Sequence, residues 1–127
     1  MRSMSTVRKM MALVFVLCMM AAPAFAADPI RIGEIATVTG DFAAYGVAEV
    51  ESVKIAVAEI NAAGGILGRP VEVVMYDCRT RQEDMVNAAR RLVEQDKVSV
   101  VIGPSGSGLC IAAAPVFNRG QVPHLGT

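Results

Sequence analysis

The stretch that decides the fold is residues 71–102, VEVVMYDCRTRQEDMVNAARRLVEQDKVSVVI. Two apolar runs, VEVVMY at 71–76 and VSVVI at 98–102, predict buried strands. Thr80 and Glu83 match a capping box, which predicts Thr80 as the N-cap of the helix between them. The apolar face of this helix carries Met85, Ala88, Ala89, Leu92 and Val93. Strand, helix and strand in this order predict a parallel pair joined by a crossover helix.

The same alternation extends in both directions along the chain. Residues 30–36 (IRIGEIA) predict a first strand, and 37–46 (TVTGDFAAYG) predict a loop. A helix follows, with apolar residues spaced three and four apart at Val50, Val53, Val57 and Ile60. Beyond the decisive stretch, the loop at 103–108 (GPSGSG) leads into a helix that closes at Gly120, and residues 122–125 begin a fourth strand. This pattern predicts an α/β fold, a doubly wound parallel sheet that is incomplete at its fourth strand.

The N-terminus has the three parts of a secretory signal peptide. Residues 2–9 contain basic side chains and no acid, residues 10–26 carry no charge, and Ala24–Ala26 form an A-x-A cleavage site. We therefore expect residues 1–26 to be removed and the protein to be periplasmic or otherwise extracytoplasmic. An uncleaved membrane anchor is the alternative, because the uncharged run reaches the lower length limit of a spanning helix.

Composition excludes several classes of protein. The chain of 127 residues allows one domain at most, and its formal net charge of 0 argues against a nucleic-acid partner. Hydrophobic residues make up 54% and charged residues only 19%, which excludes a disordered chain.

Two loops are candidates for a binding site. Ligands of open α/β sheets bind beyond the carboxyl ends of the strands, where the strand order reverses. If the strand order is 2-1-3-4, this point lies between strands one and three, and the loops at 37–46 and 103–108 leave those strands. The second loop precedes a helix N-terminus, which favours a carboxylate or phosphate, and Ser105 or Ser107 offers a hydroxyl. Ser107 as a simple N-cap and Tyr45 as a partly buried loop aromatic are the structural alternatives.

Signatures of an enzyme are scarce. No G-x-S-x-G, H-E-x-x-H or C-x-x-C motif occurs. The glycine spacing at 103–108 resembles a P-loop, but Leu109 and Cys110 stand where a Lys and a Ser or Thr belong. His124, the only histidine, is interpreted as structural, and Asp77 as a turn residue. We therefore predict no catalytic residue, no metal site and no cofactor.

Three segments carry a resemblance to a known family: IRIGEIATVTGDFAAYG, EINAAGGILGRPVEVVMYD and NAARRLVEQDKVSVVIGPSGS. Together they are similar to the branched-chain amino-acid-binding type of periplasmic solute receptor, the type I periplasmic binding fold. The resemblance implies a longer protein in which two α/β lobes close over a ligand. Residues 27–127 would be the N-terminal part of the first lobe.

The resemblance also implies roles for individual residues. Tyr45 falls where family members place an aromatic beside the ligand, and Ser107 where they place a hydroxyl against its α-carboxylate or amino group. Ser105 takes that place if the loop aligns differently. Removal of residues 1–26 would leave two of the three cysteines, Cys78 and Cys110, and in an exported protein an even pair favours a disulfide. Some relatives carry one between the positions near Cys78 and Cys110, which predicts that bridge here.

The function implied is that of the extracytoplasmic solute-binding subunit of an ABC importer. Its ligand would be a small amino acid or a related carboxylate or amide, and its partner the membrane permease. A ligand-sensing domain of a receptor or signalling protein, which shares this lobe, is one alternative. An exported α/β enzyme is the other, although no residue here supports it.

Overall fold

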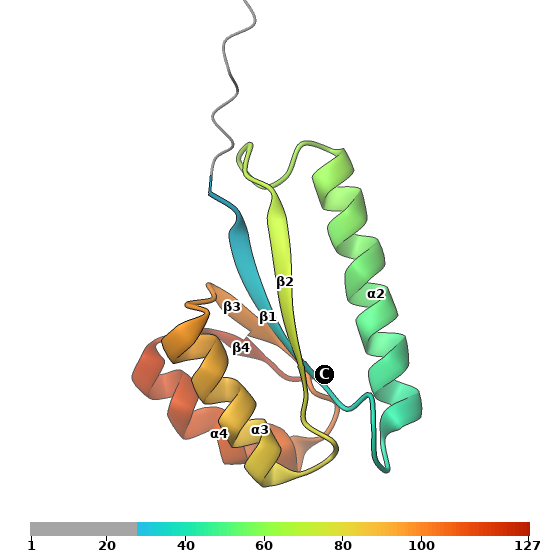
Figure 1. Cartoon of the computed structure of the whole chain (residues 1–127), viewed down its shortest axis with the longest axis vertical. Coiled ribbons are helices and arrows are strands. Elements are labelled where there is room, and N and C mark those ends of the chain that lie inside the picture. The colour runs from blue at the N-terminus through green and yellow to red at the C-terminus, as the bar shows by residue number, and fades with distance from the viewer. Residues whose placement is uncertain (1–27) are drawn as a thin grey trace, which may run out of the picture.

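The structure, a computed structural model, describes residues 28–127 as a four-stranded parallel sheet with helices on both faces (Figure 1). Its strands are β1 (Ile30–Ala36), β2 (Val71–Asp77), β3 (Val100–Ile102) and β4 (His124–Leu125). They lie in the order β2-β1-β3-β4, and every neighbouring pair is parallel. The predicted α/β fold is confirmed, and the strand order is the one assumed in locating the candidate loops. The predicted signal peptide lies outside the described residues.

Three α-helices and one π-helical turn connect these strands. Helix α2 (Ala43–Ala62) lies alone on one side of the sheet, whereas α3 (Gln82–Arg90) and α4 (Ser107–Gly120) lie side by side on the other (Figure 1). The π-helical turn η1 (Arg91–Gln95) continues α3. This division follows from right-handed crossovers between parallel strands. Within residues 28–127, no helix is both long enough and apolar enough to cross a membrane.

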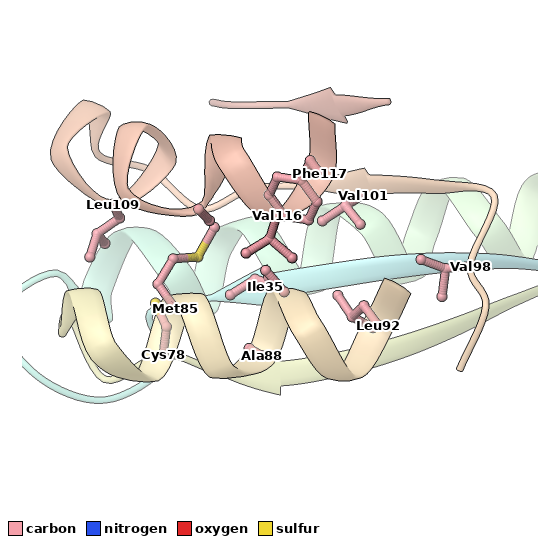
Figure 2. Packing of buried hydrophobic residues seen from close by; sticks show 12 residues of the cluster. Ile35, Cys78, Met85, Ala88, Leu92, Val98, Val101, Leu109, Val116 and Phe117 are labelled. Carbon is pink, nitrogen blue, oxygen red and sulfur yellow. The ribbon is translucent and has the colours of Figure 1, made fainter. Parts of the chain in front are cut away.

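The hydrophobic core fills the space between the sheet and the pair α3 and α4 (Figure 2). Its central side chains are fully buried, among them Ile35, Met85, Leu92, Val101 and Ala113. The apolar face predicted for the helix after β2 is therefore confirmed. Gly33 of β1 lies directly under Leu92, since an added Cβ would lie 2.8 Å from Leu92 Cδ1.

The N-terminal turn of α2 lies very close to the end of β1. Gly46 is buried there, and an added Cβ would lie 2.5 Å from the carbonyl carbon and oxygen of Thr37. The helix begins at Ala43, so the predicted loop at 37–46 was too long. Gly46 is a helical residue that permits close contact with the neighbouring backbone, whereas in the sequence it looks like a turn residue.

Side-chain hydrogen bonds hold α2 at both ends. Near its C-terminus, Asn61 Nδ2 donates to the Val71 carbonyl at 2.9 Å, and the Val71 amide donates to Asn61 Oδ1 at 2.8 Å. At its start, Thr37 Oγ1 donates to the Phe42 carbonyl at 3.2 Å. The amide of Asn61 thus pairs with β2 as a strand residue would.

The ends of several elements differ from those predicted. The N-cap of α3 is Arg81, with no side-chain cap, so the predicted capping box is wrong. Thr80 has a positive φ of 58°, and its hydroxyl instead donates to the Thr39 carbonyl at 3.4 Å. Strand β3 is shorter than predicted, because the Val98 amide donates to the Leu92 carbonyl and closes the preceding helix.

Candidate functional site

An open pocket of about 240 Å³ lies at the carboxyl edge of the sheet. It is lined by Phe42 and Tyr45 from the start of α2 and by Ser105 and Gly106 from the loop after β3. The Phe42 and Tyr45 rings meet edge to face with their centroids 6.3 Å apart, and Tyr45 is 67% exposed. The structure therefore brings together the segments that follow β1 and β3, which the sequence analysis proposed as candidates for a binding site. They leave the two neighbouring strands between which the strand order reverses.

Ser107 lies next to this pocket as the first residue of α4. The N-cap is Gly106, and no side chain caps the helix, so the structural alternative of Ser107 as N-cap is wrong. Its exposed hydroxyl and the unpaired N–H groups of the first turn are free to meet an anionic group.

The loop that carries the pocket's aromatic wall is fastened to the end of β2. Asp77 accepts a hydrogen bond from Thr39 Oγ1 at 2.5 Å and another from the Arg79 amide at 2.9 Å. Partial burial alone would raise the pKa of Asp77, but these hydrogen bonds outweigh it and hold the pKa below its ordinary value. Asp77 is thus a turn residue, as predicted.

His124 contacts the start of the loop at residues 103–108. Its Nε2 lies 2.6 Å from the Gly103 carbonyl, and its ring stacks on Phe117 with centroids 4.4 Å apart. Because a carbonyl only accepts, Nε2 carries the proton in this contact. The structural interpretation of His124 is confirmed.

The expected disulfide is absent, because Cys78 and Cys110 are both free thiols. Cys78 is fully buried in the core beside Met85 (Figure 2). Cys110 belongs to α4, and its Sγ lies 3.4 Å from the carbonyl oxygen of Pro104 in the preceding loop. Burial raises the pKa of both thiols, so neither is activated as a nucleophile. The two cysteines that would remain after removal of residues 1–26, together with the resemblance, predicted a pairing that the positions of these side chains do not provide.

The carboxyl groups of Glu34 on β1 and Glu49 on α2 interact electrostatically. Glu34 of β1 is only 1% exposed on the face covered by α2, and its Oε1 has no hydrogen-bond partner in residues 28–127. Burial, and secondly the nearby Glu49 carboxylate, raise the pKa of Glu34 above its ordinary 4.5, while Lys54 lowers it. The folded state therefore favours protonated Glu34.

This arrangement predicts a pH dependence of stability. Because the pKa of Glu34 is raised on folding, its contribution is most favourable below pH 4.5 and is lost as the pH rises through the higher folded value. Glu34→Gln should abolish this loss and raise the free energy of unfolding at pH 7.5 by about 1 kcal/mol. Urea denaturation at pH 4.5 and 7.5 measures it, with the exposed Glu51→Gln as control. Equal effects of Glu34→Gln at both pH values would contradict the prediction.

Two residues near the pocket, Phe42 and Glu49, were not identified from the sequence. Thr127 Oγ1 donates to Glu49 Oε1 at 2.6 Å and lies 3.2 Å from Ser105 Oγ. The spacing of Phe42 and Glu49, three before and four after Tyr45, is a signal that could have indicated them once the helix start was known. In the part of the chain that the structure describes, no group of His, Cys, Asp or Glu side chains could hold a metal ion.

Comparison with known proteins places this geometry in a family. The family model described as "Periplasmic binding protein" matches residues 29–127. A Leu/Ile/Val-binding protein of Rhizobium johnstonii is 40% identical over 101 residues, covering 80% of this chain and 27% of that protein. The Leu/Ile/Val-binding protein of Escherichia coli K12 is 35% identical over 91 residues, covering 72% and 24%. The chain thus spans about a quarter of the length of these relatives.

Solved structures agree with the sequence relatives. The branched-chain amino acid transporter substrate-binding protein LivJ of Streptococcus pneumoniae, solved with isoleucine, is 40% identical with a TM-score of 0.76. That match covers 78% of this chain and 28% of the solved chain. The family is one of binding proteins rather than enzymes, which agrees with the scarcity of enzyme signatures. On the family match, the relatives and the shared fold, the chain belongs to the periplasmic binding protein family.

Proposed function

We propose that residues 27–127 form the N-terminal part of the first lobe of an extracytoplasmic solute-binding protein. The complete protein would be the binding subunit of an ABC importer, with residues 1–26 as its export signal and a membrane permease as its partner. The observation that carries this proposal is the pocket at the carboxyl edge of the sheet, where Tyr45 from the first turn of α2 and Ser105 from the loop after β3 lie together. A second lobe closing over this edge would enclose a small ligand.

The ligand we propose is an aliphatic amino acid. Phe42 and Tyr45 supply an apolar wall, which suits a branched hydrocarbon side chain. The start of α4, with the free Ser107 hydroxyl and unpaired amides, suits a carboxylate. The names of the relatives, which bind Leu, Ile and Val, support the same class of ligand.

Ser107→Ala in the complete protein tests this function. Loss of a hydrogen bond to a charged ligand group costs about 1.5–3 kcal/mol, so we expect the affinity for L-leucine, L-isoleucine or L-valine to fall roughly ten- to hundredfold. Calorimetric titration measures the affinity, and a thermal melt checks that the fold is intact. Ser52→Ala is the matched control, because Ser52 Oγ only donates to the Ala48 carbonyl on exposed α2. Unchanged affinity together with a lowered melting temperature would show that Ser107 has only a structural role.

A further inference from the structure

We propose that Glu49 is a positioning residue that makes Ser105 a hydrogen-bond acceptor, so that this side of the pocket selects an ammonium group. The inference rests on the proposed binding function and adds to it the orientation of the ligand. It is carried by a chain of three side chains, Ser105, Thr127 and Glu49, which we call the hydroxyl chain.

The direction of the hydroxyl chain follows from counting protons. Glu49, as a carboxylate, can only accept, so the 2.6 Å contact with Thr127 uses the single proton of the Thr127 hydroxyl. Thr127 therefore has no proton left for Ser105, whose Oγ lies 3.2 Å from Thr127 Oγ1. Ser105 must be the donor in that contact. Its proton is directed toward Thr127, and only its lone pairs remain for a ligand.

The position of Glu49 fits this role. It lies one helical turn after Tyr45 on α2, and an added Cβ on Gly103 would lie 2.7 Å from Glu49 Oε1. The carboxylate thus rests against the backbone at the end of β3. Figure 1 shows the C-terminal end of the chain, where Thr127 lies, at the same edge of the sheet as the start of α2.

The charge of Glu49 has no internal counterion in residues 28–127. None of the ion pairs found there includes Glu49, and its buried Oε2 has no hydrogen-bond partner. The nearby Lys54 amine pairs with Glu51 at 2.7 Å instead. A negative charge left unpaired beside a pocket is stabilised by a positive group in that pocket.

Together these features give the pocket two unlike ends. Ser105, polarised by Glu49 through Thr127, accepts from an N–H donor. The start of α4 donates to an oxygen anion. An α-amino acid would therefore lie with its ammonium toward Ser105 and its carboxylate toward Ser107.

The test compares each amino acid with an analogue that differs only at the nitrogen. L-Leucine, L-isoleucine and L-valine are titrated into the complete protein, each beside the 2-hydroxy acid in which a hydroxyl replaces the ammonium. Glu49→Gln keeps the shape but removes the charge, and its amide can reverse the hydroxyl chain by donating to Thr127. We expect this variant to lose about ten- to hundredfold in affinity for the amino acids and less than threefold for the hydroxy acids. Glu51→Gln, on the same helix, is the matched control and should change neither.

A second variant tests the relay itself. Thr127→Val removes the hydroxyl while keeping the shape, and it should cause the same selective loss. Combining it with Glu49→Gln should add little, because both changes break one chain. Additive losses, or equal losses for amino acids and hydroxy acids, would overturn the inference while leaving the binding function intact. A complete wild-type protein that binds none of the three amino acids would overturn the proposed function and this inference with it.

Discussion

Replacing Gly46 with Ala is expected to destabilise the fold by about 3 kcal/mol or more. Alanine is ordinarily the better helix residue, by roughly 0.5–1 kcal/mol. Here, however, the new methyl carbon would lie 2.5 Å from backbone atoms of Thr37, which cannot move aside as a flexible side chain can. Relief requires the first turn of α2 to shift away from β1, and that shift also moves Tyr45 out of the pocket.

Gly108→Ala is the matched control for this prediction. Gly108 also lies in the first turn of a helix, but an added methyl there meets nothing closer than Gln82 Nε2 at 3.8 Å. We expect this variant to be unchanged or slightly more stable. Urea denaturation of both variants in the complete protein gives the comparison. If Gly46→Ala unfolds at the same urea concentration as Gly108→Ala, then α2 is not packed against Thr37 as described.

Leu92→Ala is expected to cost about 2–5 kcal/mol of stability, the range for large-to-small changes in a well-packed core. Leu92 is 0% exposed and lies between the sheet and the paired helices (Figure 2). Its side chain fills the space over Gly33, which has no side chain of its own. Truncation therefore leaves a cavity that the rigid strand cannot collapse to fill.

Gly33→Ala should partly repair the Leu92→Ala variant. Alone, the Gly33 substitution places a methyl 2.8 Å from Leu92 Cδ1 and 3.0 Å from Val101 Cγ2, and it should destabilise. With Leu92 truncated, the same methyl enters the vacated space. We expect a favourable coupling of about 1 kcal/mol or more in a double-mutant cycle. Strictly additive losses would show that Gly33 and Leu92 do not share this space.

The part of the fold that was predictable rests on periodic burial. Two local patterns in the sequence match the burial seen in the structure. They are the apolar helix face from Met85 to Leu92 and the nearly continuous apolar run around Val101. The strand order was assumed in the sequence analysis, and it agrees with right-handed crossovers and with helices that cover both faces of a parallel sheet. Those rules need no knowledge of individual contacts.

The errors arose where a residue's role depends on a distant backbone. Gly46 looks like a turn residue until Thr37 is placed beside it, so the start of α2 was set too late. Thr80 fits a capping box by spacing, but its positive φ turns the hydroxyl toward Thr39. In each case a tertiary contact outweighed a sound local pattern.

The segments that form the candidate site could be predicted from the sequence, but not all of its residues could. Tyr45 and Ser105 stand out by residue type and by their place after β1 and β3. Glu49 lies on what reads as an ordinary helix, and Thr127 is far from it in the sequence, so only the folded chain brings their oxygens within 2.6 Å. The predicted disulfide is wrong because Cys78 and Cys110 are suitable in number but are not placed to form a bond.

The pairing of Asn61 with Val71 sets a limit on how the length of α2 can change. The helix is anchored to β2 through Asn61 and to the end of β1 through Phe42, so neither end is free to slide. One residue inserted between these anchors would rotate the first turn by about 100° relative to the last, and Tyr45 would no longer face Ser105. We therefore expect insertions and deletions to be tolerated in the turn at residues 63–70 far better than within α2, because the length of this helix fixes the direction in which Tyr45 points at the carboxyl edge of the sheet.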